Sequence, residues 1–240
     1  MAMSHTHHSV FTMPRLRKRS FLWLPIAIFV AAVVVAGIWV TYILWPRWPA
    51  ADMALDAPTL PITVNGVNFN TPPAAIRNKV QRKAGMQERI DLVFMWPSLM
   101  PPDPAVKADP VASAKAVDRV FLTVASYGNT LPVIERLKTI YPRYLDSSMA
   151  TAPGGLTARP FRNDTPYQGE DLLYDNSNPE RFIVRCTRDD VRGTIGMCLY
   201  EKRAGQADIT ARFPREWLSD WTVVADGLDG LIRRLRGAQR

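Results

Sequence analysis

The stretch FLWLPIAIFVAAVVVAGIWVTYILW, residues 21–45, carries no charged side chain. About 20 predominantly apolar residues in helical form cross a bilayer core, so this run is long enough to span one. Trp23 lies near one end and Trp39, Tyr42 and Trp45 lie near the other, as aromatic anchors at the membrane interface do. A core helix of a soluble protein rarely stays uncharged for so long. The stretch therefore predicts a single transmembrane helix over residues 21–45.

The tail before this helix, residues 1–20, is basic. It contains Arg15, Arg17, Lys18 and Arg19 and no acidic residue. Basic residues beside a first spanning helix tend to stay in the cytoplasm. We therefore expect a single-pass protein of the cell inner membrane, with a cytoplasmic N-terminus and a periplasmic C-terminal domain.

Two other targeting interpretations share the basic tail. A cleaved signal peptide has an apolar region of only about 7–15 residues, and the small residues after Trp45 form a poor cleavage site. A mitochondrial targeting sequence is also basic and free of acids, but nothing in the tail decides for it. The length of the apolar run favours an uncleaved signal anchor.

The location of the net charge argues against a nucleic-acid partner. Four positive charges lie in the tail and four at the C-terminal end, namely Arg233, Arg234, Arg236 and Arg240, with no compensating acid at either end. These eight charges equal the whole formal charge of +8, so the residues between the two ends are formally neutral. A neutral body lacks the basic surface typical of nucleic-acid-binding domains.

The chain after the helix predicts a spacer over residues 46–61, rich in Pro and Ala, and one exported α+β domain over residues 62–240. About 180 residues are enough for one domain with its own core. In the first part of the domain, Asn65-Gly66 between two short apolar runs predicts a β-hairpin over residues 62–69. Residues 74–86 follow two prolines and are expected to form a helix.

Three further elements are expected before the C-terminal third. Arg89–Trp96 is apolar on both faces after its acidic residue, which favours a central strand, and Val117–Ser126 predicts a second strand. Leu131–Leu145 has the spacing of a helix that Pro142 ends or kinks. The connection from residue 142 to residue 181 shows no persistent periodicity, and a short strand is expected within it near Leu172–Tyr174.

The C-terminal third gives the clearest pattern. Arg181–Arg188, Thr194–Arg203 and Ala207–Phe213 predict an antiparallel meander of three strands. Pro214 then opens a helix whose apolar residues recur every three or four positions. These apolar residues are Trp217, Leu218, Trp221, Val224, Leu228, Leu231, Ile232 and Leu235. The predicted domain is therefore α+β, with a mainly antiparallel sheet and a C-terminal amphipathic helix packed on it.

The two cysteines of the chain, Cys186 and Cys198, are predicted to form a disulfide. A hairpin centred near Arg192 places them directly opposite each other, where strand residues lie about 4.5–5.5 Å apart at the α carbons. An exported compartment allows the oxidation. Two reduced core cysteines are the alternative if the domain is cytosolic.

The sequence lacks most recognisable catalytic equipment. His5, His7 and His8 are the only histidines, and a short solvated tail gives them no framework for a metal site. A domain without histidine cannot use a Ser-His-Asp or Cys-His mechanism or a His-bearing zinc site. The acidic residues between Asp164 and Asp175 do not follow calcium-loop spacing and favour a solvated loop. No cofactor or metal is expected, and a non-enzymatic role is favoured.

The function that these features favour is a membrane-anchored binding or assembly module of the cell envelope, with an envelope or membrane protein as its partner. The alternative is an anchored envelope hydrolase that uses paired carboxylates. The long connection after Pro142 keeps aromatic bulk, and we expect Phe161, Tyr167 and Tyr174 to be candidate partner-binding residues. These aromatic side chains would otherwise hold the connection against its own domain.

Overall fold

The computed structural model describes residues 23–44, 53–106, 118–128, 130–188 and 195–237. The basic tail with its three histidines, the first part of the spacer, the turn around Arg192 and the terminal Arg240 lie outside these residues. The chain divides into two units, residues 1–47 and residues 48–240.

The first unit contains one helix, α1, over Trp23–Leu44. It is long and apolar enough to cross a membrane, and none of its searched span is buried by other described residues. The hydroxyl of Thr41 donates a hydrogen bond of 2.8 Å to the carbonyl of Gly37, so this polar group is satisfied within the helix, as a bilayer requires. Helix α1 therefore has the character of a membrane anchor and not of a core helix.

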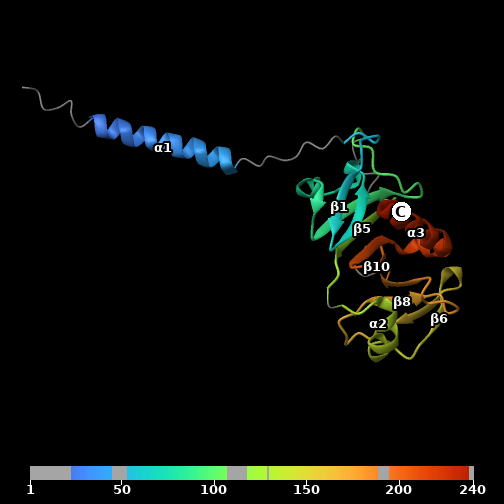
Figure 1. Ribbon diagram of the computed structural model, residues 1–240. Coiled ribbons are helices and arrows are strands. Elements are labelled where there is room, and N and C mark those ends of the chain that lie inside the picture. Colours follow the sequence, from blue (N-terminus) through green and yellow to red (C-terminus); the bar gives the residue numbers. More distant parts are fainter. Residues whose placement is uncertain (1–22, 45–52, 107–117, 129, 189–194, 238–240) are drawn as a thin grey trace, which may run out of the picture. The chain divides into compact units, whose positions relative to one another are not determined.

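The second unit is built on an eight-stranded sheet with the strand order β4-β5-β11-β10-β9-β8-β7-β6 (Figure 1). Its strand pairs are all antiparallel. The strands are β4 (Arg89–Met95), β5 (Arg119–Ser126), β6 (Ala150–Thr151), β7 (Thr157–Pro160), β8 (Glu170–Tyr174), β9 (Ile183–Thr187), β10 (Met197–Ala204) and β11 (Ala207–Pro214). This arrangement confirms the predicted antiparallel α+β fold.

A smaller sheet contains β1 (Leu60–Val64), β2 (Val67–Thr71) and β3 (Gly85–Met86) in the order β2-β1-β3. Strands β1 and β2 form the predicted hairpin. Both turn residues, Asn65 and Gly66, have positive φ angles, of 46° and 80°. Asn-Gly tolerates this conformation better than other residue pairs, which explains why the turn could be recognised.

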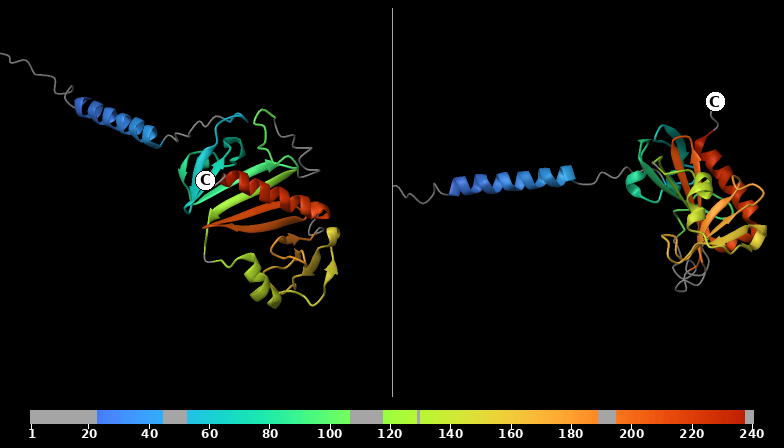
Figure 2. Two further views of the ribbon diagram at one scale, coloured as in Figure 1. Left: turned by 45° about the vertical axis from the view of Figure 1, so that its right-hand side comes forward. Right: turned by 90° about the horizontal axis from the view of Figure 1, so that it is seen from below.

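The predicted C-terminal helix packs on one face of the large sheet (Figure 2). It begins with a 3-10 segment, Arg215–Asp220, and continues as α3 over Trp221–Arg236. Its buried residues are Trp221, Val224, Ala225, Leu228, Leu231, Ile232 and Leu235. Asp229 of α3 accepts hydrogen bonds from Tyr200 Oη at 3.2 Å and Lys202 Nζ at 2.6 Å, both on β10. Apolar burial and this polar contact together fix the helix on the sheet.

A second core cluster lies at the β8–β9 end of the opposite face. Helix α2 (Val133–Thr139) and a 3-10 turn (Tyr141–Arg143) cover it. The buried members of the cluster are Tyr141, Leu145, Phe161, Leu172, Tyr174 and Ile183. The opposite face is therefore covered at this end.

The helix expected over residues 74–86 is absent. Two 3-10 turns, Pro73–Ala75 and Lys79–Gln81, are followed there by strand β3. The first turn is entirely buried and the second has no buried residue, so no continuous apolar stripe faces the core. Ile76 bridges instead to Leu92 of β4. Pairing with a distant strand overrides the local helix propensity here.

Strand β4 was expected to be central but forms an edge of the large sheet. One side pairs with β5. The other side pairs with no strand among the described residues and is covered by nearby loop segments. Ile76 forms a bridge to Leu92, Arg77 N donates a hydrogen bond of 2.9 Å to Asp91 O, and Asp91 N donates one of 2.9 Å to Gln81 Oε1. The turn Pro73–Ala75 contacts β4. This covering segment buries the strand, which explains how an edge strand can be apolar on both faces.

Two other elements differ in length from the expectation. The helix predicted over residues 131–145 is only the seven-residue α2, and Pro142 lies in the 3-10 turn after it. Residues 142–181 contain β6, β7 and β8, of which β8 confirms the short strand near Leu172–Tyr174. Strands of two and four residues such as β6 and β7 are too short to show a period, so only pairing with their neighbours defines them.

The disulfide between Cys186 and Cys198 is confirmed. The two residues are direct partners in the β9–β10 pairing, with their α carbons 4.0 Å apart. We expect thiol labelling of the denatured, unreduced protein to detect no free cysteine. Replacing both residues with serine should lower the free energy of unfolding by about 2–3 kcal/mol, because the closed loop is short. Labelling at both positions before reduction would contradict the disulfide.

Gly154 provides a test of how tightly α3 is held. A β carbon at this position would lie 2.7 Å from Trp221 Cδ1 and 2.8 Å from the carbonyl oxygen of Leu218. Gly154→Ala should therefore destabilise the domain by about 1–3 kcal/mol more than Gly155→Ala, as overpacking does. Gly155 is the matched control, since its φ is also positive and nothing lies within 4 Å of its β carbon. Equal melting temperatures of the two variants would contradict the close packing.

Candidate functional site

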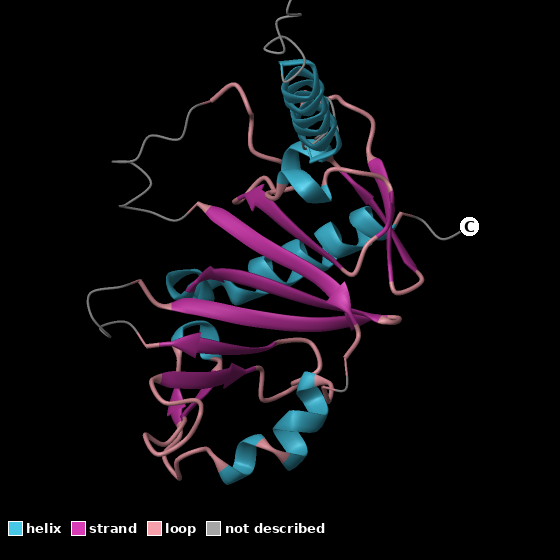
Figure 3. Cartoon of the chain, turned by 90° about the vertical axis from the view of Figure 1, so that its left-hand side faces the viewer, coloured by secondary structure: helices cyan, strands magenta, loops and turns pink. Residues whose placement is uncertain are grey.

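The face of the large sheet opposite α3 is only partly covered (Figure 3). Side chains alternate between the two faces of a strand. Along β5, Val120, Leu122 and Val124 are buried in the core with α3, so Phe121 and Thr123 point to the opposite face. Helix α2 covers the β8–β9 end of this face and reaches β10 through an ion pair of 2.7 Å between Arg136 and Glu201. The part around Phe121, Leu199 and Arg212, on β5, β10 and β11, carries no α-helix within the described residues. We call this uncovered part the open face.

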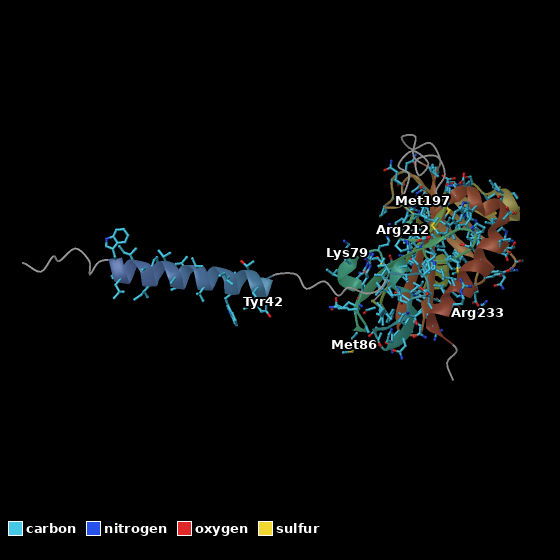
Figure 4. All side chains as sticks on the ribbon, turned by 90° about the horizontal axis from the view of Figure 1, so that it is seen from above. Tyr42, Lys79, Met86, Met197, Arg212 and Arg233 are labelled. Atoms are coloured by element: carbon cyan, nitrogen blue, oxygen red, sulfur yellow. A yellow bond between two sulfur atoms is a disulfide. The ribbon has the colours of Figure 1, made fainter. Side chains whose placement is uncertain are left out.

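A groove of about 550 Å³ crosses the open face and reaches residues from six strands. Its lining residues are Arg77, Arg89, Asp91, Phe121, Thr123, Glu170, Arg185, Thr187, Met197, Cys198, Leu199 and Arg212. Figure 4 labels Met197 and Arg212 at the same region of the domain, away from Arg233 of α3. The groove therefore combines four arginines and two carboxylates with an apolar floor.

Two of the four arginines have no acidic partner among the residues that the structure describes. Arg212 is exposed on β11, between its cross-strand neighbours Phe121 on β5 and Leu199 on β10. Arg77 is also exposed, and its guanidinium carbon lies 4.8 Å from the centre of the Phe121 ring, in a cation–π contact. Neither side chain forms an ion pair within the described part of the chain. Both positive charges are therefore accessible.

The other two arginines are neutralised by the carboxylates of the groove. Arg89 contacts Asp91 at 2.8 Å, and Arg185 contacts Glu170 at 2.9 Å. Four positive and two negative side chains give the described lining a formal charge of +2. The groove is therefore basic although the body of the protein is neutral.

Asp91 is held in its charged form by several donors. Burial raises the pKa of its carboxyl, but hydrogen bonds from Arg89, Gln81 and Thr123 together outweigh burial and lower the pKa below the ordinary value. Thr123 Oγ1 donates at 2.9 Å and Gln81 Nε2 at 3.1 Å. A carboxylate committed to three donors is suited to fixing the groove wall and not to exchanging protons.

The two carboxylates of the groove lie too far apart to act together. Asp91 is on β4 and Glu170 is on β8, and the strand order places five strand spacings between these strands. At about 4.8 Å per spacing this is roughly 24 Å, whereas glycoside hydrolysis uses carboxyl groups about 5–9.5 Å apart. This pair therefore does not form the carboxylate site of the alternative hydrolase function.

The described residues contain no group of three or more His, Cys, Asp or Glu that is arranged to hold a metal ion. Glu170 and Asp171 were expected on a solvated acidic loop, but both lie on β8 and are ion-paired. Asp171 is buried, and its two oxygens bind Arg188 at 2.8 Å and Arg215 at 2.7 Å. These acids tie neighbouring strand ends together and are not available as free oxygen ligands.

The aromatic residues predicted to bind a partner lie in the second core cluster. Phe161 and Tyr174 are 1% and 8% exposed, and Tyr167 is half-buried. The rings of Phe161 and Tyr167 are 4.7 Å apart. None of the three lines the groove, although the ring of Tyr167 contacts a groove residue: the Arg185 guanidinium carbon lies 5.0 Å from its centre. A role of these three residues in partner binding stays a prediction.

Sequence reasoning missed the arginines of the groove. The signal present in the sequence was the alternation of polar and apolar residues, such as Arg89 and Asp91 in β4, and Thr210 and Arg212 in β11. Alternation predicts that one face of a strand is polar. It does not show that these strands are neighbours or that their polar faces line one groove.

No family model and no curated protein matches this chain. A solved structure with a similar fold is Smlt3025, an immunity protein of the Stenotrophomonas maltophilia type IV secretion system. The match has a TM-score of 0.52 and 14% sequence identity, and covers 74% of this chain and 93% of that one. A second is the Neisseria meningitidis iron-regulated outer membrane lipoprotein FrpD, with a TM-score of 0.42, 11% identity and coverage of 72% and 92%. At this identity the first likeness concerns the fold alone, and the second adds nothing to it.

Proposed function

We propose that this protein is a single-pass, membrane-anchored binding module of the cell envelope. The apolar helix α1 and the disulfide indicate a membrane-anchored protein whose domain lies on the envelope side. Our proposal adds that α1 lies in the inner membrane, that the domain is periplasmic, and that an envelope or membrane protein binds its open face.

The observation that carries the proposal is the groove on the open face. Antiparallel sheets often leave one face to solvent, but a solvated face needs neither an apolar floor nor a net charge. Here Phe121 and Leu199 are only half-buried, between accessible arginines. Exposed apolar and aromatic surface rimmed by charge is characteristic of protein-binding sites.

The structural neighbour Smlt3025 is an immunity protein of a secretion system. Immunity is therefore one specific form of envelope binding to test for this chain. Under this version of the proposal, the open face binds a secreted protein, and cells that lack the chain become sensitive to it.

The proposed topology divides the chain into a cytoplasmic tail (1–20), a spanning helix (21–45), a spacer (46–61) and a periplasmic domain (62–240). Reporters fused after residue 240 should test this topology. Alkaline phosphatase, which needs disulfides, should be active there, and a cytoplasmic reporter such as green fluorescent protein exported through the same route should be dark. The opposite pattern would contradict the N-in orientation.

Site-specific photo-crosslinking in growing cells tests the binding proposal. Benzoylphenylalanine in place of Phe121 retains an aromatic ring in the groove, and the same residue in place of Val223 probes the exposed side of α3, where Val223 is 57% exposed. We expect a protein crosslink at position 121 and none at position 223. Equal crosslinking at both positions, or none at position 121, would contradict a binding site on the open face.

A further inference from the structure

We propose that the groove recognises an acidic segment of its protein partner, whose carboxylates pair with Arg77 and Arg212 while an apolar side chain packs between them. This inference rests on the proposed function and specifies the chemistry of the partner. It follows from three observations: the distribution of charge, the order of side chains across the strands, and the mixed character of the lining.

The distribution of charge over the described lining leaves two arginines without an ion pair. Asp91 and Glu170 are engaged by Arg89 and Arg185, so the net charge of the described lining resides on Arg77 and Arg212. A guanidinium presents a planar fork of donors that matches a carboxylate. Carboxylates supplied by a partner would therefore form ion pairs with these two arginines, like the Arg89–Asp91 and Arg185–Glu170 pairs within the groove.

The order of side chains forms a row across four strands. In the strand register, Phe121 on β5 is opposite Arg212 on β11, which is opposite Leu199 on β10, which is opposite Arg185 on β9. Apolar and basic side chains thus alternate along the row, with neighbouring positions about 4.8 Å apart. Arg77 adds a further charge at the Phe121 end. A segment lying along this row would meet apolar and basic side chains in turn.

The mixed character of the lining selects a polypeptide over a uniform polyanion. At the two ends of the groove, on β4 and β8, Asp91 and Glu170 already neutralise Arg89 and Arg185, so a continuous row of phosphates would find no free cation there. The half-buried floor of Phe121 and Leu199 offers apolar contacts that phosphates do not use. A protein segment can place carboxylates and apolar side chains at the centre of the groove and uncharged side chains at its ends, so it complements the whole lining.

The test uses the full-length protein in lipid nanodiscs and a phage library of short random peptides as the probe. We expect the selected peptides to be enriched in Asp and Glu next to Leu or Phe, and their affinity, measured by fluorescence anisotropy, to fall with added salt. Arg212→Glu and Arg77→Glu should each weaken binding by about tenfold or more. Arg233→Glu changes an exposed arginine of α3 by the same charge and should have no effect.

The charge-neutral variants Arg212→Gln and Arg77→Gln guard against misfolding. They should weaken binding less than the glutamate variants and retain the wild-type circular dichroism. Selected peptides without acidic enrichment, or unchanged binding by all four variants, would overturn the inference.

The crosslink at position 121 separates this inference from the proposed function. Loss of the cellular crosslink in Arg212→Glu supports an acidic partner, whereas a crosslink that persists in Arg212→Glu leaves the binding module in place and refutes its preference for acids. A crosslinked product composed of two copies of this chain would also refute the acidic partner. Absence of any crosslink in the parent protein would refute the proposed function itself.

Discussion

Replacing Asp171 with alanine should lower the free energy of unfolding by about 3 kcal/mol, near the lower end of the range for removing one partner of a buried charge pair. The carboxylate bridges Arg188, which follows β9, and Arg215, which follows β11. Without it, two guanidinium groups remain close together and only partly exposed. Denaturant titration of the full-length protein in detergent, followed by circular dichroism, measures the change.

Asp164→Ala provides the matched control for Asp171→Ala. Asp164 also pairs with an arginine, Arg162, at 3.2 Å, but its side chain is 75% exposed. Exposed pairs contribute about 0–1 kcal/mol, so this variant should unfold close to the parent protein. Similar decreases in the free energy of unfolding of the two variants would show that burial of the Asp171 ion pairs does not contribute to the stability of the domain.

Trp221→Ala should be at least as damaging, with a loss of about 3–5 kcal/mol. The ring is 8% exposed and lies 5.1 Å from the ring of Phe182. Its Nε1 donates a hydrogen bond of 2.9 Å to the carbonyl of Gly154. Alanine would therefore leave a cavity and also remove the donor to the Gly154 carbonyl.

Two variants separate the contribution of the Trp221 hydrogen bond from that of its ring packing. Trp221→Phe keeps most of the ring and removes the hydrogen bond, so it should cost less than alanine. Val223→Ala, on the exposed side of the same helix, should stay within about 0.5 kcal/mol of the parent. A Trp221→Ala protein that unfolds normally but no longer binds a partner would show that the ring belongs to a binding surface and not to the core.

The parts of the fold that could be predicted have signals within a short stretch of sequence. The charge-free run defines α1, the Asn65-Gly66 pair defines the first hairpin, and the periodic apolar residues define α3. The disulfide could be predicted because Cys186 and Cys198 are the same number of residues from Arg192, the centre of the predicted hairpin, and are therefore cross-strand partners. Each of these inferences uses neighbours in sequence.

The parts that failed depend on contacts between distant residues. Residues 74–86 lack a helix because Ile76 pairs with β4, and β4 is an edge because no other described strand pairs with its outer side. The acids on β8 were assigned to solvent because their partners, Arg185, Arg188 and Arg215, belong to later segments. Periodicity alone carries no information about such partners.

The candidate site could not be predicted for the same reason. Its components were visible as alternating polar residues in separate strands, but the groove exists only because α3 covers one face and α2 covers one end of the other. Phe161 and Tyr174 were chosen for their aromatic character in a long connection. That connection folds into strands of its own, and its aromatic side chains lie mostly inside.

The covered edge of β4 has a consequence for crowding in the plane of the membrane. An open strand edge acts as a template for main-chain pairing and drives chains to polymerise sideways. In the described part of the chain, Ile76 and Arg77 occupy one end of the large sheet, and the other end is the two-residue strand β6. Within the described residues, the two edges of the large sheet are therefore poor templates for main-chain pairing between neighbouring anchored copies, and contacts there would depend on side chains instead of the backbone.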